Sequence, residues 1–117
     1  MAFSRFFRST RLDASLVSTA IGLYLLLGSL GTLLFQSLEA LEPGSFVLGN
    51  GGRAGAADLH YFSFVTMTTV GYGDITPSSA IARSGSLTLA IVGQMYLVVV
   101  LGRLVGLQHK DDQDEVA

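Results

Sequence analysis

Thr68-Thr69-Val70-Gly71-Tyr72-Gly73-Asp74 is the stretch that decides the fold of this chain, because it lies between two long apolar segments. The first segment, 14–38, has no charged residue, and the second, 79–108, has only Arg83 and Arg103. A helix over either range is about 37 Å long or more, which is enough to cross a bilayer with some tilt. The pattern predicts an all-α membrane protein with two transmembrane helices.

The composition also favours a small membrane protein. Half of the 117 residues are hydrophobic, the mean hydropathy is +0.53 and there is no cysteine. This is too apolar for an ordinary soluble domain, and it excludes a disulfide framework or a thiolate metal site. A secretory signal peptide is the competing interpretation of 14–38. That run is too long for a signal core, and Leu38-Glu39-Ala40 is a poor cleavage site.

The segment before the heptapeptide is too short to span a membrane. The range 43–57 is glycine-rich without an apolar period, and it is predicted to be an irregular exposed loop. Asp58 is a candidate N-cap for a helix over 58–68, which reaches only ~15 Å. Such a helix must be re-entrant, and lipid cannot satisfy the polar backbone of the extended residues 69–73. We therefore expect a path filled by water or ions.

Charge is concentrated at the two ends of the chain. The range 1–13 is basic and 109–117 is acidic, and neither resembles a nucleic-acid surface. Two spans place both termini on one side, and the arginine and lysine near them predict that both are cytoplasmic in a multi-pass protein of the cell membrane. The basic end is expected to meet membrane lipids, and the acidic end to be a solvated, frayed tail.

Over 14–108 the sequence resembles the pore module of potassium channels, specifically the two-helix bacterial type, and the heptapeptide carries this resemblance. The resemblance implies a passive channel with no enzymatic activity and K⁺ as the transported ion. Its parts would be an outer helix at 14–38, a pore helix at 58–68, a selectivity filter at 69–73 and an inner helix at 79–108.

The filter residues are of the types that this function needs. The resemblance implies K⁺ sites at the backbone carbonyls of Thr69, Val70, Gly71 and Tyr72, with the Thr69 hydroxyl innermost and Gly73 at the outer mouth. Carbonyls aimed at one axis require successive peptides of alternating hand, which Gly71 and Gly73 tolerate. One chain supplies one oxygen per layer, so four chains must surround one axis, and we expect a homotetramer.

The resemblance also assigns residues that support the filter. It implies that the Tyr61 hydroxyl donates a hydrogen bond to Asp74 and that Tyr72 meets Thr66. The sequence departs from the family pattern at Val65, which replaces a carboxylate that pairs with the aspartate in some members. Fewer cross-links behind the filter are therefore expected.

The second apolar segment carries the candidate gating residues. Gly93 lies at the position of a hinge glycine in the family's inner helix, although close packing against the pore helix is an alternative role. The same alignment directs Gln94, Leu97 and Leu101 toward a water-filled cavity. An interhelical hydrogen bond is the other interpretation of Gln94.

Small residues in the first segment have two interpretations as well. They admit a neighbouring helix at close range, or they are simply common in membrane helices. These residues are Gly22, Gly28, Ser29 and Gly31.

Rival functions remain at this stage. A nonselective cation channel of the same fold typically departs from the pattern at the position of Tyr72, which is present here. A non-conducting membrane subunit that serves assembly would keep the fold without conducting. A potassium transporter with several pore repeats is disfavoured because this chain contains one filter segment.

Overall fold

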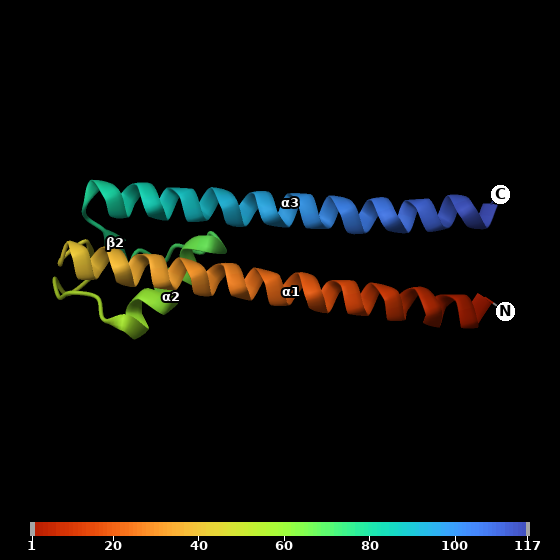
Figure 1. Cartoon of the computed structure of the whole chain (residues 1–117), viewed down its shortest axis with the longest axis horizontal. Coiled ribbons are helices and arrows are strands. Elements are labelled where there is room, and N and C mark those ends of the chain that lie inside the picture. Colours follow the sequence, from red (N-terminus) through yellow and green to blue (C-terminus); the bar gives the residue numbers. More distant parts are fainter. Residues whose placement is uncertain (1, 117) are drawn as a thin grey trace.

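The computed structural model describes residues 2–116, with side chains described for 14–106, 113 and 114. Two long helices dominate it: α1, Ala2–Leu41, and α3, Ala80–Val116. They run antiparallel, so the start of α1 and the end of α3 lie at the same end of an elongated molecule (Figure 1). The short helix α2, Ala56–Met67, and the strands β1, Phe46–Leu48, and β2, Ile75–Pro77, lie near the other end.

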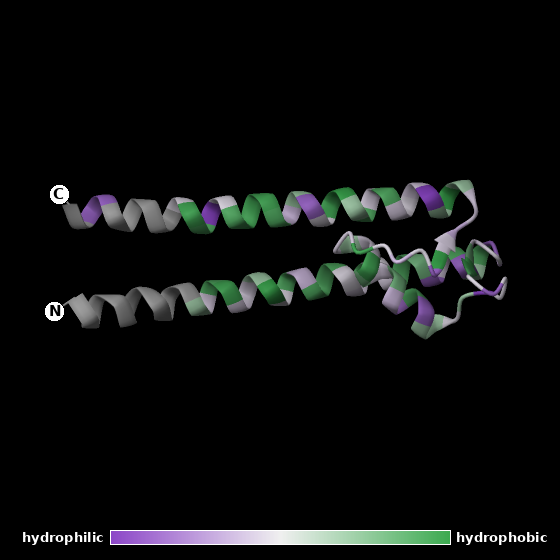
Figure 2. Ribbon diagram, turned by 180° about the vertical axis from the view of Figure 1, so that it is seen from behind, coloured by the Kyte–Doolittle hydropathy of each residue, from purple (hydrophilic) through white to green (hydrophobic). Residues whose placement is uncertain are grey.

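Both long helices contain a segment that is long and apolar enough to cross a membrane. These segments are Ala14–Leu41 and Ala80–Gly106, and apolar residues line both helices in Figure 2. They agree with the predicted spans 14–38 and 79–108 to within a few residues. The helices themselves continue further, because 2–13 and 107–116 contain no proline or glycine that would end them. The predicted frayed tail at 109–117 is therefore wrong for 109–116, which is helical.

The predicted irregular loop at 43–57 is wrong in part, because β1 lies within it. β1 pairs with β2 in an antiparallel ribbon that aligns Phe46 with Pro77 and Leu48 with Ile75. Gly44 and Gly51 turn the chain on either side of β1 with φ of +88° and +86°, values that L side chains rarely adopt. A strand of three residues is too short for a period-2 pattern, and its partner lies on the far side of the heptapeptide.

The buried core lies where α1, α2 and the ribbon meet. The rings of Phe35, Phe46 and Phe62 pack against one another with centroids 5.1–5.3 Å apart. Leu59 and Ile75 are also buried. Each ring comes from a different element, so this aromatic cluster joins α1, β1 and α2.

Two glycines of α1 allow α2 to approach closely. A Cβ on Gly28 would lie within 3 Å of the Phe64 ring, and one on Gly31 would clash with the Ser63 hydroxyl. The Ser63 hydroxyl donates to the Gly28 carbonyl at 2.7 Å. The close-approach interpretation is confirmed at these two positions. Around Gly22 the described chain leaves open space.

Candidate functional site

The helix that leads into the heptapeptide begins at a glycine N-cap. α2 starts after Gly55, and the Oδ2 atom of Asp58 accepts a hydrogen bond from the Gly55 N–H at 2.9 Å. The prediction of Asp58 as the N-cap is thus wrong by three residues, because its carboxylate reaches back from the third helical position. Its negative charge also lies in the first turn, where the helix dipole favours it.

At the other end of α2, the first filter residues satisfy helix carbonyls. Residues 68, 69 and 71 point their N–H groups back along the helix axis. The Thr68 N–H donates to the Phe64 carbonyl at 3.0 Å, and the Thr69 N–H to the Thr66 carbonyl at 3.1 Å. The Gly71 N–H reaches the Val65 carbonyl at 3.2 Å. Three carbonyls of the last turn therefore help to fix the direction in which the filter leaves the helix.

The filter backbone alternates in hand. Thr69, Gly71 and Gly73 have φ of +63°, +51° and +80°, whereas Val70 and Tyr72 between them have none in the left-handed region. This confirms the prediction of alternating hand for both glycines. Thr69 was not predicted to join them, because an L-residue in this region costs roughly 1–2 kcal/mol. Alternation over five residues lets successive carbonyls face one side.

One wall of the filter is bare in a single chain. The side chains of Val70 and Tyr72 are 51% and 73% exposed. A Cβ added at Gly71 or Gly73 would meet no atom within 4 Å. Among the described contacts, no hydrogen bond joins Tyr72 to Thr66, so that pairing stays a prediction.

Asp74 lies beside the Tyr61 phenol, as the resemblance implied. Tyr61 is on α2, outside both spanning segments, and burial, the hydrogen bond to Asp74 and the Asp74 charge all raise its pKa. The phenol is protonated at ordinary pH, so its hydroxyl can donate to Asp74. The Asp74 Oδ1 atom also accepts the Ile75 N–H at 3.1 Å.

The ribbon anchors the outer end of the filter. The Asp74 carbonyl, directly after the filter, accepts the Gly49 N–H at 2.8 Å. β2 then pairs with β1 from Ile75 onward. The residue that follows the filter is thereby tied to the segment that precedes α2.

Glu39 is a supporting residue that the sequence reasoning missed. Its carboxylate, only 7% exposed, accepts the Gly44 N–H at 2.8 Å, the Phe46 N–H at 3.0 Å and the Arg53 Nε at 3.4 Å. It thereby holds the start of β1 to the end of α1. The available signal was a single carboxylate closing a long apolar run, since such a charge needs partners.

Gly93 packs against the end of α2. A Cβ on Gly93 would lie 2.6 Å from Met67 Cγ and 2.8 Å from the Met67 carbonyl oxygen. This geometry is the close packing that was the alternative role of Gly93. Its role as a hinge stays a prediction.

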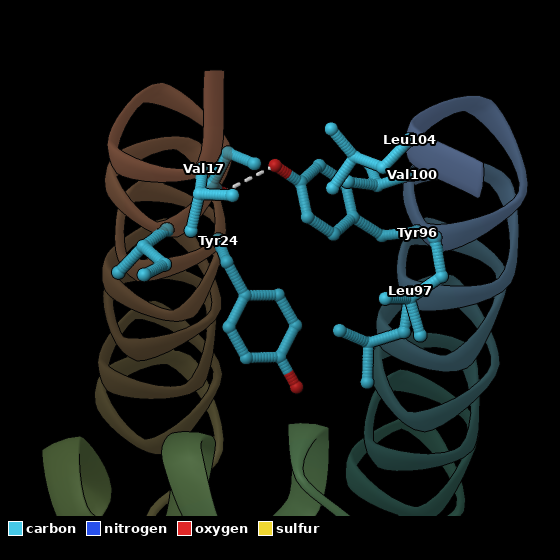
Figure 3. A pocket seen from close by; sticks show the side chains of 9 residues that line it. Val17, Tyr24, Tyr96, Leu97, Val100 and Leu104 are labelled. Carbon is cyan, nitrogen blue, oxygen red and sulfur yellow. Dashed lines mark hydrogen bonds between the residues drawn. The ribbon is translucent and has the colours of Figure 1, made fainter. Parts of the chain in front are cut away.

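The other candidate gating residues lie on the inner half of α3. Gln94 is exposed, whereas Leu97 and Leu101 line a groove of about 160 Å³ between α1 and α3, shown in Figure 3. In this groove Leu97 and Leu101 face α1, and the structure does not test whether they line a water-filled cavity. The assignment of all three residues to such a cavity therefore stays a prediction.

Comparison with known proteins identifies the family. Residues 19–107 match a family described as "Ion channel", so the chain belongs to this family of ion channels. Together with the two spans, this match confirms the predicted fold class of an all-α membrane protein.

Curated relatives of the chain carry potassium channel names. Two-pore potassium channel 3 of Arabidopsis thaliana is 32% identical over 96 residues, which cover 82% of this chain and 21% of the relative. Potassium channel subfamily K member 17 of Homo sapiens is 34% identical over 85 residues, covering 70% and 26%. Two pore potassium channel c of Oryza sativa subsp. japonica is 36% identical over 66 residues, covering 56% and 14%. The chain spans about a seventh to a quarter of the length of these relatives.

Proposed function

We propose that this chain forms a potassium-selective channel in which backbone carbonyls of residues 69–73 replace the hydration shell of K⁺. The observation that carries the proposal is the alternation of hand at Thr69, Gly71 and Gly73 in a segment between two membrane spans. Alternating peptides can present a file of oxygens to one axis, as in potassium channel filters. The potassium channel names of the relatives support the same ion.

We propose a homotetramer as the conducting form. One chain supplies one oxygen per layer, and a cation between two layers needs several. The bare wall of the filter, with Tyr72 73% exposed, leaves space for neighbouring copies. The arginine and lysine residues near both chain ends support a cytoplasmic position for the termini in the cell membrane, because this preference counts Arg and Lys and not net charge.

The selective channel is favoured over its rivals by residues of the filter. Tyr72 stands at the position where nonselective channels of this fold depart from the pattern. A non-conducting subunit would not need Thr69 in a conformation that costs an L-residue energy. The chemistry assigned to this site is transport down a gradient, without enzymatic turnover.

Flux through liposomes tests the proposal with two matched variants. Purified protein should pass K⁺ far faster than Na⁺ and be blocked by Ba²⁺. Gly71→Ala should abolish selectivity or conduction. Gly51→Ala should leave both unchanged, because Gly51 also has a positive φ and open surroundings but lies in the loop before α2. Equal Na⁺ and K⁺ flux through the unmodified protein, or an assembly of other than four filter segments by native mass spectrometry, would overturn it.

A further inference from the structure

The last carbonyl of α2 differs from the three before it. The carbonyls of residues 64, 65 and 66 accept N–H groups from the filter segment itself. The Met67 carbonyl instead accepts the hydroxyl of Tyr24, a residue of α1, at 3.4 Å. Among the described hydrogen bonds, the Met67 carbonyl is thus the one carbonyl of this turn whose partner comes from another helix.

The surroundings of Met67 are closely packed. Met67 is completely buried, and Gly93 of α3 packs directly against its carbonyl. A buried carbonyl without a partner is costly, so the Tyr24 hydroxyl has no ready substitute. Met67 is followed immediately by Thr68 and Thr69, where the proposed ion path begins.

α3 in turn holds Tyr24 in position. The Tyr96 ring stacks on the Tyr24 ring with centroids 5.5 Å apart and planes 28° apart. The Tyr96 hydroxyl donates to the Ala20 carbonyl at 2.5 Å, one turn before Tyr24 on the same helix. Figure 3 shows the two rings side by side between α1 and α3.

We infer that Tyr24 is a positioning residue for the inner end of the filter, and that the stack of its ring on the Tyr96 ring, and not the Tyr96 hydroxyl, couples it to the position of α3. This inference rests on the proposed function. At 3.4 Å the bond from Tyr24 to Met67 lies near the long limit for a hydrogen bond, so a small shift of α1 or α3 makes or breaks it. Movement of α3 therefore changes the hydrogen bond at the Met67 carbonyl through the tyrosine stack, although Tyr96 itself does not contact the ion path.

The chain offers a matched pair of variants. Tyr24→Phe keeps the ring stack and removes the hydroxyl that reaches Met67. Tyr96→Phe keeps the same stack and removes the hydroxyl that reaches Ala20, which lies on α1 and not at the filter. Both changes delete one oxygen atom from a tyrosine in a membrane span, so general effects on folding are matched.

One measurement reads the Met67 carbonyl without requiring conduction. With ¹³C-carbonyl methionine and ¹⁵N-threonine, Met67-Thr68 is the sole labelled Met-Thr peptide in the sequence. Solid-state NMR of the protein in lipid should show a displaced carbonyl shift in Tyr24→Phe and an unchanged one in Tyr96→Phe. An unchanged signal in Tyr24→Phe overturns the inference, even if the protein does not conduct.

Single-channel recordings then test the consequence for the filter. Removing the hydroxyl leaves the buried Met67 carbonyl without its partner, and this cost corresponds to a shift of about two- to tenfold in an equilibrium even though the bond itself is long. Tyr24→Phe should lower the ratio of conducting to non-conducting time by that factor, and raised K⁺ should restore it, because K⁺ binds the conducting filter. Tyr96→Phe should stay within twofold of the unmodified channel.

The outcomes separate this inference from the proposed function. A channel that conducts K⁺ selectively but is equally affected by both variants, or by neither, overturns the role of Tyr24 and leaves the function standing. An unmodified protein without selective conduction overturns the function, and the NMR shift alone then decides whether Tyr24 positions Met67.

Discussion

In the half of the molecule that contains α2 and the ribbon, which we call the outer half, the side chains of α1, α2 and β1 bury one another. In the opposite half, which we call the inner half, α1 and α3 expose most of their apolar side chains. Phe35, Phe46 and Met67 are completely buried, but Val98 and Val105 are 62% and 65% exposed. Both regions are apolar, so hydrophobicity alone does not distinguish them. The difference shows that α1, α2 and β1 pack together within one chain, whereas most apolar side chains of α1 and α3 in the other half are left uncovered by the described residues.

The largest expected effect is on the free energy of unfolding when a leucine is replaced by alanine in each half of the molecule. Leu59→Ala removes a side chain that is 2% exposed in the aromatic core, and it should lower the free energy of unfolding by about 2–5 kcal/mol. Leu101→Ala removes the same atoms from a residue that is 58% exposed, and it should cost about 1 kcal/mol or less. Calorimetry in detergent would show whether the halves differ, and equal losses would contradict the comparison.

The second comparison is between two glycines of α3. Gly93→Ala forces a methyl group against the Met67 carbonyl and should destabilise the protein by about 1–3 kcal/mol. Gly102→Ala meets open space and should be neutral or stabilising by up to ~1 kcal/mol, because alanine favours helix. Thermal unfolding measures both. Unchanged stability in Gly93→Ala, with reduced channel opening, would favour the hinge role over close packing.

A substitution at Glu39 tests whether the stability of the outer half depends on this one buried carboxylate. Glu39→Gln leaves two backbone N–H groups facing an amide that cannot accept from both as the carboxylate does, and it should cost about 1–3 kcal/mol. The Arg53 pair adds little, since that side chain is 65% exposed. Faster hydrogen exchange at Gly44 and Phe46 would report the loss. Glu42→Gln, on an exposed residue, should change neither amide.

The smallest effect concerns Tyr61 and pH. The pKa of Tyr61 is raised above its usual 10.0 in the folded protein, so the folded state holds this proton more tightly than the unfolded chain. Stability from this site is complete below pH ~10 and falls as the pH rises through the folded pKa. Unfolding midpoints measured in alkaline buffer should therefore decline less steeply in Tyr61→Phe. Identical slopes would show that folding does not raise the pKa of Tyr61.

The parts of the fold that were predicted from sequence are those set by local chemistry. Residues 14–38 and 79–108 are long apolar runs that need no partner to be recognised, because a span is a matter of length and hydropathy. The left-handed conformations at Gly71 and Gly73 followed from residue type. Thr69 did not, because its conformation depends on hydrogen bonds around the end of α2.

The supports of the filter were recognised less completely. Tyr61 and Asp74 were paired through a family pattern, and the structure brings them together. Glu39 and Tyr24 were missed because their partners are backbone groups, which carry no side-chain signature in a sequence. The β ribbon was missed because its short strands lie on opposite sides of the filter.

The order of residues along the chain was therefore enough to specify two apolar spans, the short helix between them and the extended segment 69–73, since each is encoded within a continuous stretch. Three features depended on the folded arrangement: the ribbon that ties Asp74 to Gly49, the packing of Gly93 on Met67, and the tyrosine pair that links α3 to α2 through α1. Their partners are far apart in sequence, and backbone carbonyls and amides look the same at every position until folding brings a particular one within reach.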